Sequence, residues 1–314
     1  MRHMNAFRKG NSQREFHQRF ASQSAMEYLM TYGWAILIIA VVLAALFELG
    51  VFNPMTFAPK APPGSCQVVR PEGAGTTDFI SLSGECNGEL PQYVARLGNS
   101  PAYILIAKDQ YIPSAGSGSR TISLWFNSLA PGSSGTVFTQ PRTGQPNLDV
   151  CGSFNLGAED LGGNRIVFGL HKCTNDIWTY SPRALYGVWN YVAVSYNNLS
   201  DTVTFYINDN TTGPITNIGM FPSNGNFTIG GWDDYWATLS GYVSNVQIYN
   251  TALSTNEIQA LYQEGIGGAP IKIQNLAGWW PLNGNANDYS GNGNNGVPNG
   301  ITYTSNWYSG YSAP

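Results

Sequence analysis

Short stretches of alternating apolar and polar residues recur from Tyr93 to the C-terminus, and they limit the fold more than any other feature of the chain. They are rich in Val, Ile, Thr and aromatic residues, and turns full of Asn, Gly, Ser and Asp separate them. The clearest runs are TISLWF (121–126), VWNYVAVSY (188–196), DTVTFYIN (201–208), FTIGGW (227–232) and YVSNVQIY (242–249). No strand–helix–strand spacing occurs among them, so we expect a mainly β fold, an antiparallel β-sandwich.

One helix is expected inside this β region. Ser254 and Glu257 have the S-x-x-E spacing of a capping box, and Leu253 and Ile258 can form a hydrophobic staple around it. Gly265 stands where such a helix would end. The pattern predicts a short helix over about residues 255–264.

A second constraint is the uncharged run LMTYGWAILIIAVVLAALF (29–47). As a helix it would be about 28 Å long, close to the hydrocarbon thickness of a bilayer. Basic residues precede it and a Pro-rich stretch follows it, so the positive-inside rule puts the N-terminus in the cytoplasm and the chain after Gly50 outside. We therefore expect a single-pass protein of the cell membrane, or a surface filament, with an extracellular C-terminal domain.

The charges separate a basic leader from an acidic body. Residues 1–22 hold five Lys or Arg and one Glu, whereas the remaining chain holds ten Lys or Arg against eighteen Asp or Glu. The high content of Gly, Asn, Ser and Thr with few charges is typical of secreted β proteins rather than cytosolic enzymes. The body has no cluster of Lys and Arg in its sequence, which argues against a nucleic-acid partner.

The basic leader ends in Ala21-Ser22 and is followed by QSAMEYLMTYGWAILIIAVV (23–42). Together they resemble the class III signal peptide and N-terminal helix of archaeal type IV pilin-like proteins. The resemblance implies cleavage between Ser22 and Gln23, and a hydrophobic pilin-like or transmembrane helix over residues 23–52 that stays on the mature subunit.

The same resemblance gives a role to Glu27 in assembly. A carboxylate beside an apolar helix is costly unless it is paired. The implied partner is the new α-amino group of Gln23, on the same or a neighbouring subunit. The alternative is a plain membrane anchor, in which Glu27 lies at the level of the lipid headgroups.

Residues 53–65 are rich in Pro, Gly and Ser, so we expect an extended linker before the folded body. Cys66 and Cys86 flank a weakly alternating segment, which predicts a disulfide-pinned hairpin over residues 66–92.

Cys151 and Cys173 bracket a second Gly-rich segment. Four cysteines in an extracellular setting favour disulfides, and we expect Cys66–Cys86 and Cys151–Cys173 because local pairing closes the shorter loops. A zinc site is disfavoured, since no C-x-x-C motif occurs and His171 is the sole histidine after the leader.

Three segments of the body follow one another as ISLWF, WNYVAVSY and GYVSNVQIYNTALSTNEIQALYQEG. They resemble concanavalin A-like domains of the laminin G and pentraxin type, which implies a jelly-roll sandwich over residues 93–314. GWWPLNGNANDYSGNGNNGVPNGITYT (278–304) resembles the first strand and Asn/Gly loop of that family, yet here it comes after the closing helix. We therefore expect a circular permutation in which residues 276–314 supply strands to the sandwich.

Relatives with this fold bind carbohydrate or protein, often with a calcium ion, and some are enzymes. Retaining glycoside hydrolysis needs two carboxylates about 5 Å apart, often alternating along one strand. No E-x-D-x-E string occurs, and the acids of Glu159-Asp160 and Asp233-Asp234 are adjacent, so they would point to opposite faces of a strand. We expect no enzymatic activity, with a surface glycoside hydrolase as the alternative.

The segment GGWDDYW (230–236) combines aromatic rings with carboxylates directly after a predicted strand. Such rings suit the CH faces of sugars and the carboxylates suit their hydroxyls. The alternative is that the rings are core or rim aromatics. The candidate ligand-binding residues are Trp232, Asp233, Asp234, Tyr235 and Trp236.

Two further sets of residues are candidate sites. Asn287, Asp288 and Asn292 offer hard oxygen ligands that suit calcium, or they form a simple Asn/Gly turn. Three N-x-S/T sequons fall in predicted turns, which fits external glycosylation but also unmodified turns. They begin at Asn198, Asn210 and Asn226.

These features predict a cell-surface subunit, pilin-like or membrane-anchored, that displays a lectin-like domain for adhesion or surface recognition. The expected partners are membrane lipid, other copies or pilin-like subunits, and a carbohydrate or surface glycoprotein ligand. Two alternatives stay open: a surface-anchored carbohydrate-active enzyme and a purely structural filament subunit.

Overall fold

The computed structural model describes residues 28, 30–46, 66–69, 78–81, 90–98, 101–107, 118–129, 135–140, 154–160, 165–170, 177–178, 184–219, 226–231 and 240–314. The chain divides into two compact units, Met1–Ala58 and Pro59–Pro314.

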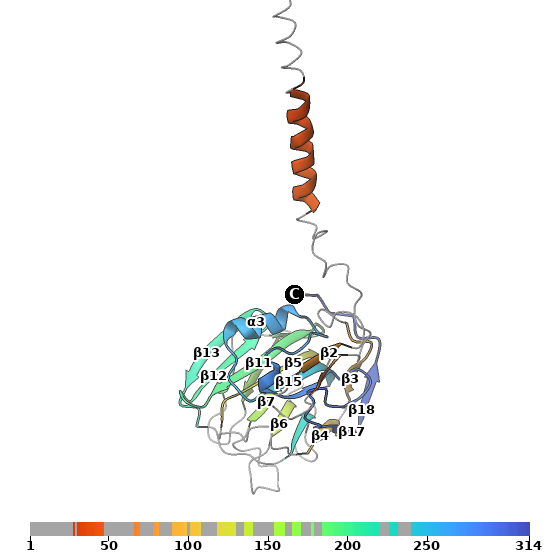
Figure 1. The fold of residues 1–314 in the computed structure, drawn as a ribbon. Coiled ribbons are helices and arrows are strands. Elements are labelled where there is room, and N and C mark those ends of the chain that lie inside the picture. Colours follow the sequence, from red (N-terminus) through yellow and green to blue (C-terminus); the bar gives the residue numbers. More distant parts are fainter. Residues whose placement is uncertain are drawn as a thin grey trace, which may run out of the picture. The chain divides into compact units, whose positions relative to one another are not determined.

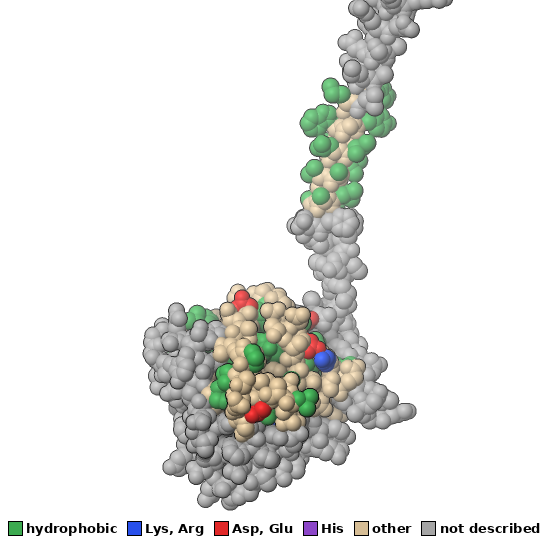
Figure 2. Space-filling model, turned by 90° about the vertical axis from the view of Figure 1, so that its left-hand side faces the viewer, with side chains coloured by type: hydrophobic (Ala, Val, Ile, Leu, Met, Phe, Trp, Pro, Cys, Tyr) green, Lys and Arg blue, Asp and Glu red, His purple; other side chains and the backbone are tan. Residues whose placement is uncertain are grey.

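The first unit contains a helix whose described residues are 28 and 30–46, within the expected range of 23–52. Its apolar side chains are exposed around the helix, among them Trp34 (65% exposed) and Ile39 (58%), and Figure 2 shows them projecting along its length. Within the described residues, we find no helix that combines the length and the apolar character needed to cross a membrane. The predicted leader cleavage at Ser22 and Gln23, and the assembly role of Glu27, lie outside the described residues.

The second unit is built from short strands, a helix and a 3₁₀ helix (Figure 1). The strands are β1 (Cys66–Val69), β2 (Asp78–Ser81), β3 (Val94–Leu97), β4 (Tyr103–Ile106), β5 (Arg120–Ser128), β6 (Gly135–Gln140), β7 (Phe154–Asp160), β8 (Arg165–Leu170), β9 (Ile177–Trp178), β10 (Ala184–Leu185), β11 (Asn190–Asn197), β12 (Thr202–Ile207), β13 (Asn210–Thr216), β14 (Phe227–Gly230), β15 (Gly241–Tyr249), β16 (Leu276–Trp280), β17 (Gly296–Asn299) and β18 (Ile301–Thr304). The helix is α3 (Thr255–Gln263), and the 3₁₀ helix is Ile273–Asn275.

The strands form two large antiparallel sheets. The β6 sheet has the order β10-β8-β7-β6-β14-β4-β17, with β9 also on β8. The β5 sheet has the order β13-β12-β11-β5-β15-β3-β18, with β16 also on β15. Apolar side chains from both sheets form one core cluster between them, including Phe126 and Ile248 from the β5 sheet and Phe138 and Ile229 from the β6 sheet. The antiparallel sandwich expected from the alternating runs is therefore confirmed.

The β5 sheet is also covered on its outer face, the face that points away from the β6 sheet. A second cluster lies there, in which Trp125 of β5 and Tyr249 of β15 pack with Ile258 and Leu261 of α3 and with Trp307 of the C-terminal tail. This part of the unit therefore has three layers: the β6 sheet, the β5 sheet, and α3 with the tail.

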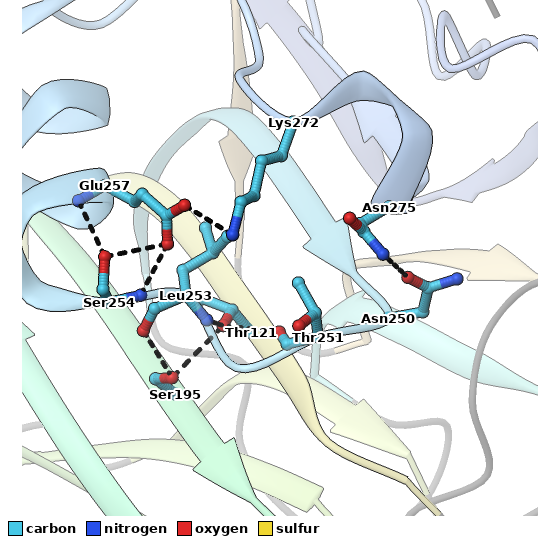
Figure 3. Close-up of polar contacts among 9 residues, drawn as sticks. All are labelled: Thr121, Ser195, Asn250, Thr251, Leu253, Ser254, Glu257, Lys272 and Asn275. Carbon is cyan, nitrogen blue, oxygen red and sulfur yellow. Dashed lines mark hydrogen bonds and ion pairs between the residues drawn. The ribbon is translucent and has the colours of Figure 1, made fainter.

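The start of α3 is fixed by its caps. The Ser254 side chain accepts a hydrogen bond from the Glu257 N–H, and the Glu257 carboxylate accepts from the Ser254 N–H, which completes the predicted capping box. Lys272 forms an ion pair with the same carboxylate (Figure 3). The helix runs over Thr255–Gln263, so the expected helix is confirmed.

A hydroxyl of β5 ties the chain before α3 to the sheet. The Thr121 hydroxyl donates to the carbonyl of Thr251 (2.9 Å) and accepts from the N–H of Leu253 (2.8 Å), while the Ser195 hydroxyl donates to the Leu253 carbonyl (3.1 Å; Figure 3). These contacts fix where the helix begins on the outer face.

The C-terminal segment contributes to both sheets. Strand β16 pairs with β15, β17 pairs with β4 at one edge of the β6 sheet, and β18 pairs with β3 at one edge of the β5 sheet. The side chains of Trp279 (4% exposed) and Trp280 (0%) are both buried. Residues 276–314 are therefore integral to the sandwich.

Candidate functional site

The predicted ligand segment connects the two sheets. Its five candidate residues lie outside the described residues, so their role stays a prediction: Trp232, Asp233, Asp234, Tyr235 and Trp236. Before them, Gly231 follows β14, and its N–H donates to the carbonyl of Ala102 (3.2 Å). After them, the carbonyl of Ser240 accepts from the N–H of Leu129 (3.0 Å), just before β15. The connection thus leaves an inner strand of the β6 sheet and enters an inner strand of the β5 sheet.

Two threonines lie side by side on the β6 sheet, on strands β6 and β14. Thr228 of β14 pairs with Thr139 of β6, and each side chain is only 1% exposed. Their neighbours Ile229 and Phe138 belong to the core cluster, so the two threonines point to the opposite face. Neither hydroxyl has a hydrogen-bond partner among the described residues. An unpaired buried polar group costs about 1–3 kcal/mol. Because both side chains are buried, the pair affects the stability of the sheet and is not open to a ligand.

The Asn/Gly loop is organised around the Asp288 carboxylate. Its Oδ1 accepts from the N–H groups of Trp279 (3.0 Å) and Ser290 (2.8 Å), and its Oδ2 accepts from the Ser290 hydroxyl (2.8 Å) and the Asn294 N–H (2.9 Å). A carboxylate has about four lone-pair positions, so these four donors use its capacity. The carboxylate holds the loop against β16.

The other two predicted calcium ligands serve the same loop or face solvent. Asn292 donates from its side-chain amide to the carbonyls of Leu276 (3.1 Å) and Ala277 (2.9 Å), and Asn287 is exposed. No cluster of three or more His, Cys, Asp or Glu side chains suited to a metal occurs in the described part of the chain. The Asp288 carboxylate is engaged by four donors of its own loop and of β16, and calcium binding at this loop stays a prediction.

Of the four cysteines in the predicted disulfides, only Cys66 lies in the described part of the chain. Cys66 begins β1, which pairs with β2 in an isolated antiparallel hairpin where Cys66 lies opposite Ser81. Cys86, Cys151 and Cys173 lie outside the described residues, so both disulfides stay predictions.

The three sequons differ in their surroundings. Asn198 lies in the turn between β11 and β12, where the next residue, Leu199, is 94% exposed. Asn210 is exposed at the start of the edge strand β13. Asn226 is exposed, but Thr228 of its sequon is buried within β14. The asparagines of the second and third sequons are exposed and that of the first is half-buried, and glycosylation at all three stays a prediction.

One group of surface residues was missed by sequence reasoning. On the outer face of the β5 sheet, Tyr242 of β15 lies opposite Arg96 of β3, and Arg96 lies opposite Thr302 of β18. We call these three residues the Arg96 row. Their neighbours Val243 and Ala95 belong to the core, so the row points away from it. Alternation could assign each residue to a surface, but only the strand register brings the three together.

A series of aromatic rings in contact extends from the C-terminal tail to Tyr242 of this row. Tyr308 stacks on Trp307 with ring centroids 4.2 Å apart, Trp307 meets Trp189 edge-on at 6.0 Å, and Trp189 stacks on Tyr242 at 6.2 Å. Trp189 and Trp307 are buried, whereas Tyr308 is 56% exposed. The indole N–H of Trp307 donates to the carbonyl of Pro91 (3.0 Å), which holds the tail in place.

A buried cation lies between the sheets at the start of β5. Arg120 is 1% exposed and donates from Nη1 to the Gln140 side chain of β6. Burial lowers the pKa of Arg120 to about 9, against the opposing effect of Tyr196. Burial and the nearby Asp201 raise the pKa of Tyr196 to about 12, and the Tyr196 hydroxyl donates to that carboxylate (3.2 Å). The contact of Arg120 with Gln140 joins the two sheets.

No curated protein is significantly similar to this chain in sequence. The solved structure of a Bacteroides ovatus protein assigned to carbohydrate binding has a TM-score of 0.51 at 17% identity, over 73% of this chain and 63% of that protein. The heptameric SAP-like pentraxin of Limulus polyphemus gives a TM-score of 0.49 at 16% identity, over 67% of this chain and 94% of the pentraxin. The first structure shows a shared fold, and this chain spans less than two thirds of its length.

The sequence itself also matches a protein-family profile. Residues 99–259, just over half of the 314-residue chain, match a laminin G-type family described as the concanavalin A-like lectin/glucanases superfamily. The chain therefore belongs to the concanavalin A-like lectin/glucanases superfamily.

Proposed function

We propose that this protein is a cell-surface adhesion or recognition subunit whose sandwich binds carbohydrate. Membership of the concanavalin A-like superfamily is the observation that carries the proposal. The carbohydrate-binding assignment of the Bacteroides ovatus relative is in line with it.

The segment that follows β14, residues 232–236, is the proposed ligand site. The carboxylates of Asp233 and Asp234 would accept hydrogen bonds from sugar hydroxyls, while the aromatic rings of Trp232 and Trp236 would contact apolar sugar faces.

Full-length protein in detergent should be assayed against a panel of polysaccharides, with binding and cleavage scored separately. Trp232→Ala and Trp236→Ala should lower affinity. Thr139→Val and Thr228→Val replace buried, unpartnered hydroxyls and should leave affinity unchanged without lowering stability, so they serve as controls. Binding unchanged in Trp232→Ala and Trp236→Ala would remove this segment from the proposal.

We propose that the domain binds without catalysis. The sequence has no E-x-D-x-E string, and Glu159-Asp160 and Asp233-Asp234 are adjacent pairs. Retaining hydrolysis needs two facing carboxylates about 5 Å apart, which adjacent positions of a strand would not supply. Release of reducing ends from any polysaccharide of the panel would support the alternative of a carbohydrate-active enzyme.

The N-terminal unit is proposed to attach the protein to the cell surface as a pilin-like subunit or anchor. Residues 30–46 expose apolar side chains that find no cover within the described chain, which favours lipid or the helices of other subunits as their surroundings. The intact mass of the surface protein should correspond to a chain that begins at Gln23. Glu27→Ala should impair assembly or retention if Glu27 pairs with the new amine, and Glu27→Gln would test whether charge is required. Recovery of surface protein that keeps residues 1–22 would exclude the pilin-type processing.

A further inference from the structure

We infer that the Arg96 row is a second binding site, specific for an acidic saccharide that carries a carboxylate on a sugar ring. The inference rests on the carbohydrate-binding function proposed above, but it concerns a different sheet and a different class of sugar. The site lies on the outer face of the β5 sheet, whereas the proposed ligand segment 232–236 follows β14 of the β6 sheet.

The guanidinium of Arg96 is available to a ligand. Arg96 is exposed, and among the described residues it forms no ion pair or hydrogen bond. The contrast with other described cations is clear: Lys272 is paired with Glu257, and Arg120 is buried against Gln140. A free guanidinium presents a planar fork that matches a carboxylate through two parallel hydrogen bonds.

The ring next to Arg96 is held in place from behind. Tyr242 is half-buried, and its ring stacks on Trp189 at 6.2 Å with an interplanar angle of 25°. The buried Trp189 is itself fixed, because its indole N–H donates to the carbonyl of Trp307 (2.9 Å). A preorganised aromatic ring loses little freedom on binding, so Tyr242 is suited to stack on the CH face of a sugar.

The spacing of the row suits a short oligosaccharide. The three residues lie on neighbouring strands, and two strand separations amount to about 10 Å. Tyr242 provides a stacking surface, Arg96 in the middle provides the positive charge, and the exposed Thr302 provides a hydroxyl that can donate or accept. One sugar could stack on Tyr242 while its carboxylate, or that of the next sugar, pairs with Arg96.

The charge balance favours a small acidic sugar over larger anions. Anionic membranes are recognised by clusters of about four to eight basic residues, and nucleic acids by stripes of them. The row offers one guanidinium, in a body with ten basic and eighteen acidic residues. A single local cation beside a ring can hold one carboxylate, but it cannot hold a polyanionic surface against the repulsion of this body.

The test compares trigalacturonate with its methyl ester, in which each carboxylate is replaced by an uncharged ester. Full-length wild-type protein in detergent should bind the acid about tenfold more tightly, and 0.5 M NaCl should reduce this preference. Arg96→Gln should abolish the preference, Arg96→Lys should retain part of it, and Tyr242→Ala should weaken binding of both ligands. Lys272→Gln removes one exposed charge elsewhere on the domain and should leave the preference unchanged.

The outcomes separate this inference from the proposed function. Acid and ester bound equally by wild type, or a preference that survives Arg96→Gln, overturns the acidic-sugar site while leaving carbohydrate binding standing. If Arg96→Gln and Lys272→Gln lowered the preference for the acid equally, the preference would come from general charge attraction. That result would also overturn the acidic-sugar site. Binding of neither sugar, with Arg96-dependent binding to phosphatidylglycerol vesicles, would replace it by a lipid headgroup. Failure of the whole polysaccharide panel would refute the proposed function instead.

Discussion

The outer face of the β5 sheet has two halves that share strands but differ in what lies over them. One half is covered by α3 and the C-terminal tail, and it buries Trp125, Tyr249 and Trp307. The other half carries the Arg96 row, where Arg96 and Thr302 face solvent. Large side chains of the covered half are buried and stabilise the fold. On the half with the Arg96 row, the same strands leave polar side chains exposed to solvent.

The polar groups of the covered half are satisfied within the chain. The Tyr249 hydroxyl donates to the Gln247 side chain (2.7 Å) and accepts from the Ile271 N–H (3.2 Å), and Gln247 in turn donates to Asn245 (3.0 Å). Burial raises the pKa of Tyr249 well above its ordinary value. The open half has no such network among the described residues. The comparison predicts that changes in the covered half should cost stability and that changes in the open half should cost binding.

Removing residues 276–314 should have the largest effect. The deletion takes away β16, β17 and β18 together with the buried rings of Trp280 and Trp307. Loss of each large core ring costs about 3–5 kcal/mol, so the two rings alone amount to about 6–10 kcal/mol, which is comparable to the whole stability of a typical domain. Circular dichroism should then show no cooperative thermal transition. Deleting only the exposed residues 312–314 is the control, and a cooperative transition at the wild-type temperature in the longer deletion would contradict the expectation.

Trp307→Ala tests the covered half with a single side chain. Trp307 is 1% exposed and contacts Trp189 and Tyr311. Its truncation should lower the free energy of unfolding by about 3–5 kcal/mol, as measured by urea denaturation. Its neighbour Tyr308 is 56% exposed, so Tyr308→Ala should cost less than about 1 kcal/mol. Equal losses of unfolding free energy in the two variants would show that the tail does not cover and stabilise this half.

Alkaline pH should reveal a contribution from the inner side of the open half. Burial raises the pKa of Tyr303, next to Thr302 on β18, to about 12. Above about pH 10 the unfolded tyrosine ionises while the folded one stays protonated, so its contribution is complete below pH 10 and is lost as pH rises toward 12. Tyr303→Phe should flatten this part of the stability curve.

The Tyr303→Phe variant should also be at least as stable as wild type at pH 7. Its hydroxyl is buried and has no hydrogen-bond partner among the described residues, so its removal leaves no partner behind. Urea titrations at pH 7, 9.5 and 11.5 would measure both effects, with Tyr308→Phe as an exposed control. An unchanged slope between pH 9.5 and 11.5 would assign the alkaline loss to other groups.

The smallest change in stability is expected for Arg96→Gln. Because Arg96 is exposed and unpaired in the described part of the chain, its replacement should shift the free energy of unfolding by less than about 0.5 kcal/mol. The same urea titration measures this value. A loss above 1 kcal/mol would mean that the row is a structural element, and the distinction between the two halves would fail.

The sequence was informative where local rules decide structure. The alternation in residues 121–126 and 242–249 predicted β5 and β15, and the capping box predicted α3. Strand β6 was harder to see, because all six of its residues are buried and a strand covered on both faces loses its alternation.

The candidate sites depended more on long-range register. Asp288 offers the same carboxylate whether it binds a metal or caps its own loop, and only its four donors distinguish the two. The Arg96 row joins residues from three distant segments, so no local pattern could predict it. Sequence rules reach as far as single elements, whereas a site made across strands requires their pairing.

The position of β18 beside β3 has a mechanical consequence. Strand β3 is the first strand of the sandwich, and β18 turns it from an edge strand into one that is hydrogen-bonded on both sides, to β15 and to β18. Just ahead of it, Pro91 accepts from Trp307 and the Tyr93 N–H donates to Asn283 (2.8 Å). Tension applied from the N-terminal side would therefore be shared between two ladders and the C-terminal tail, so the last residues of the chain reinforce the point at which a pulling force enters the domain.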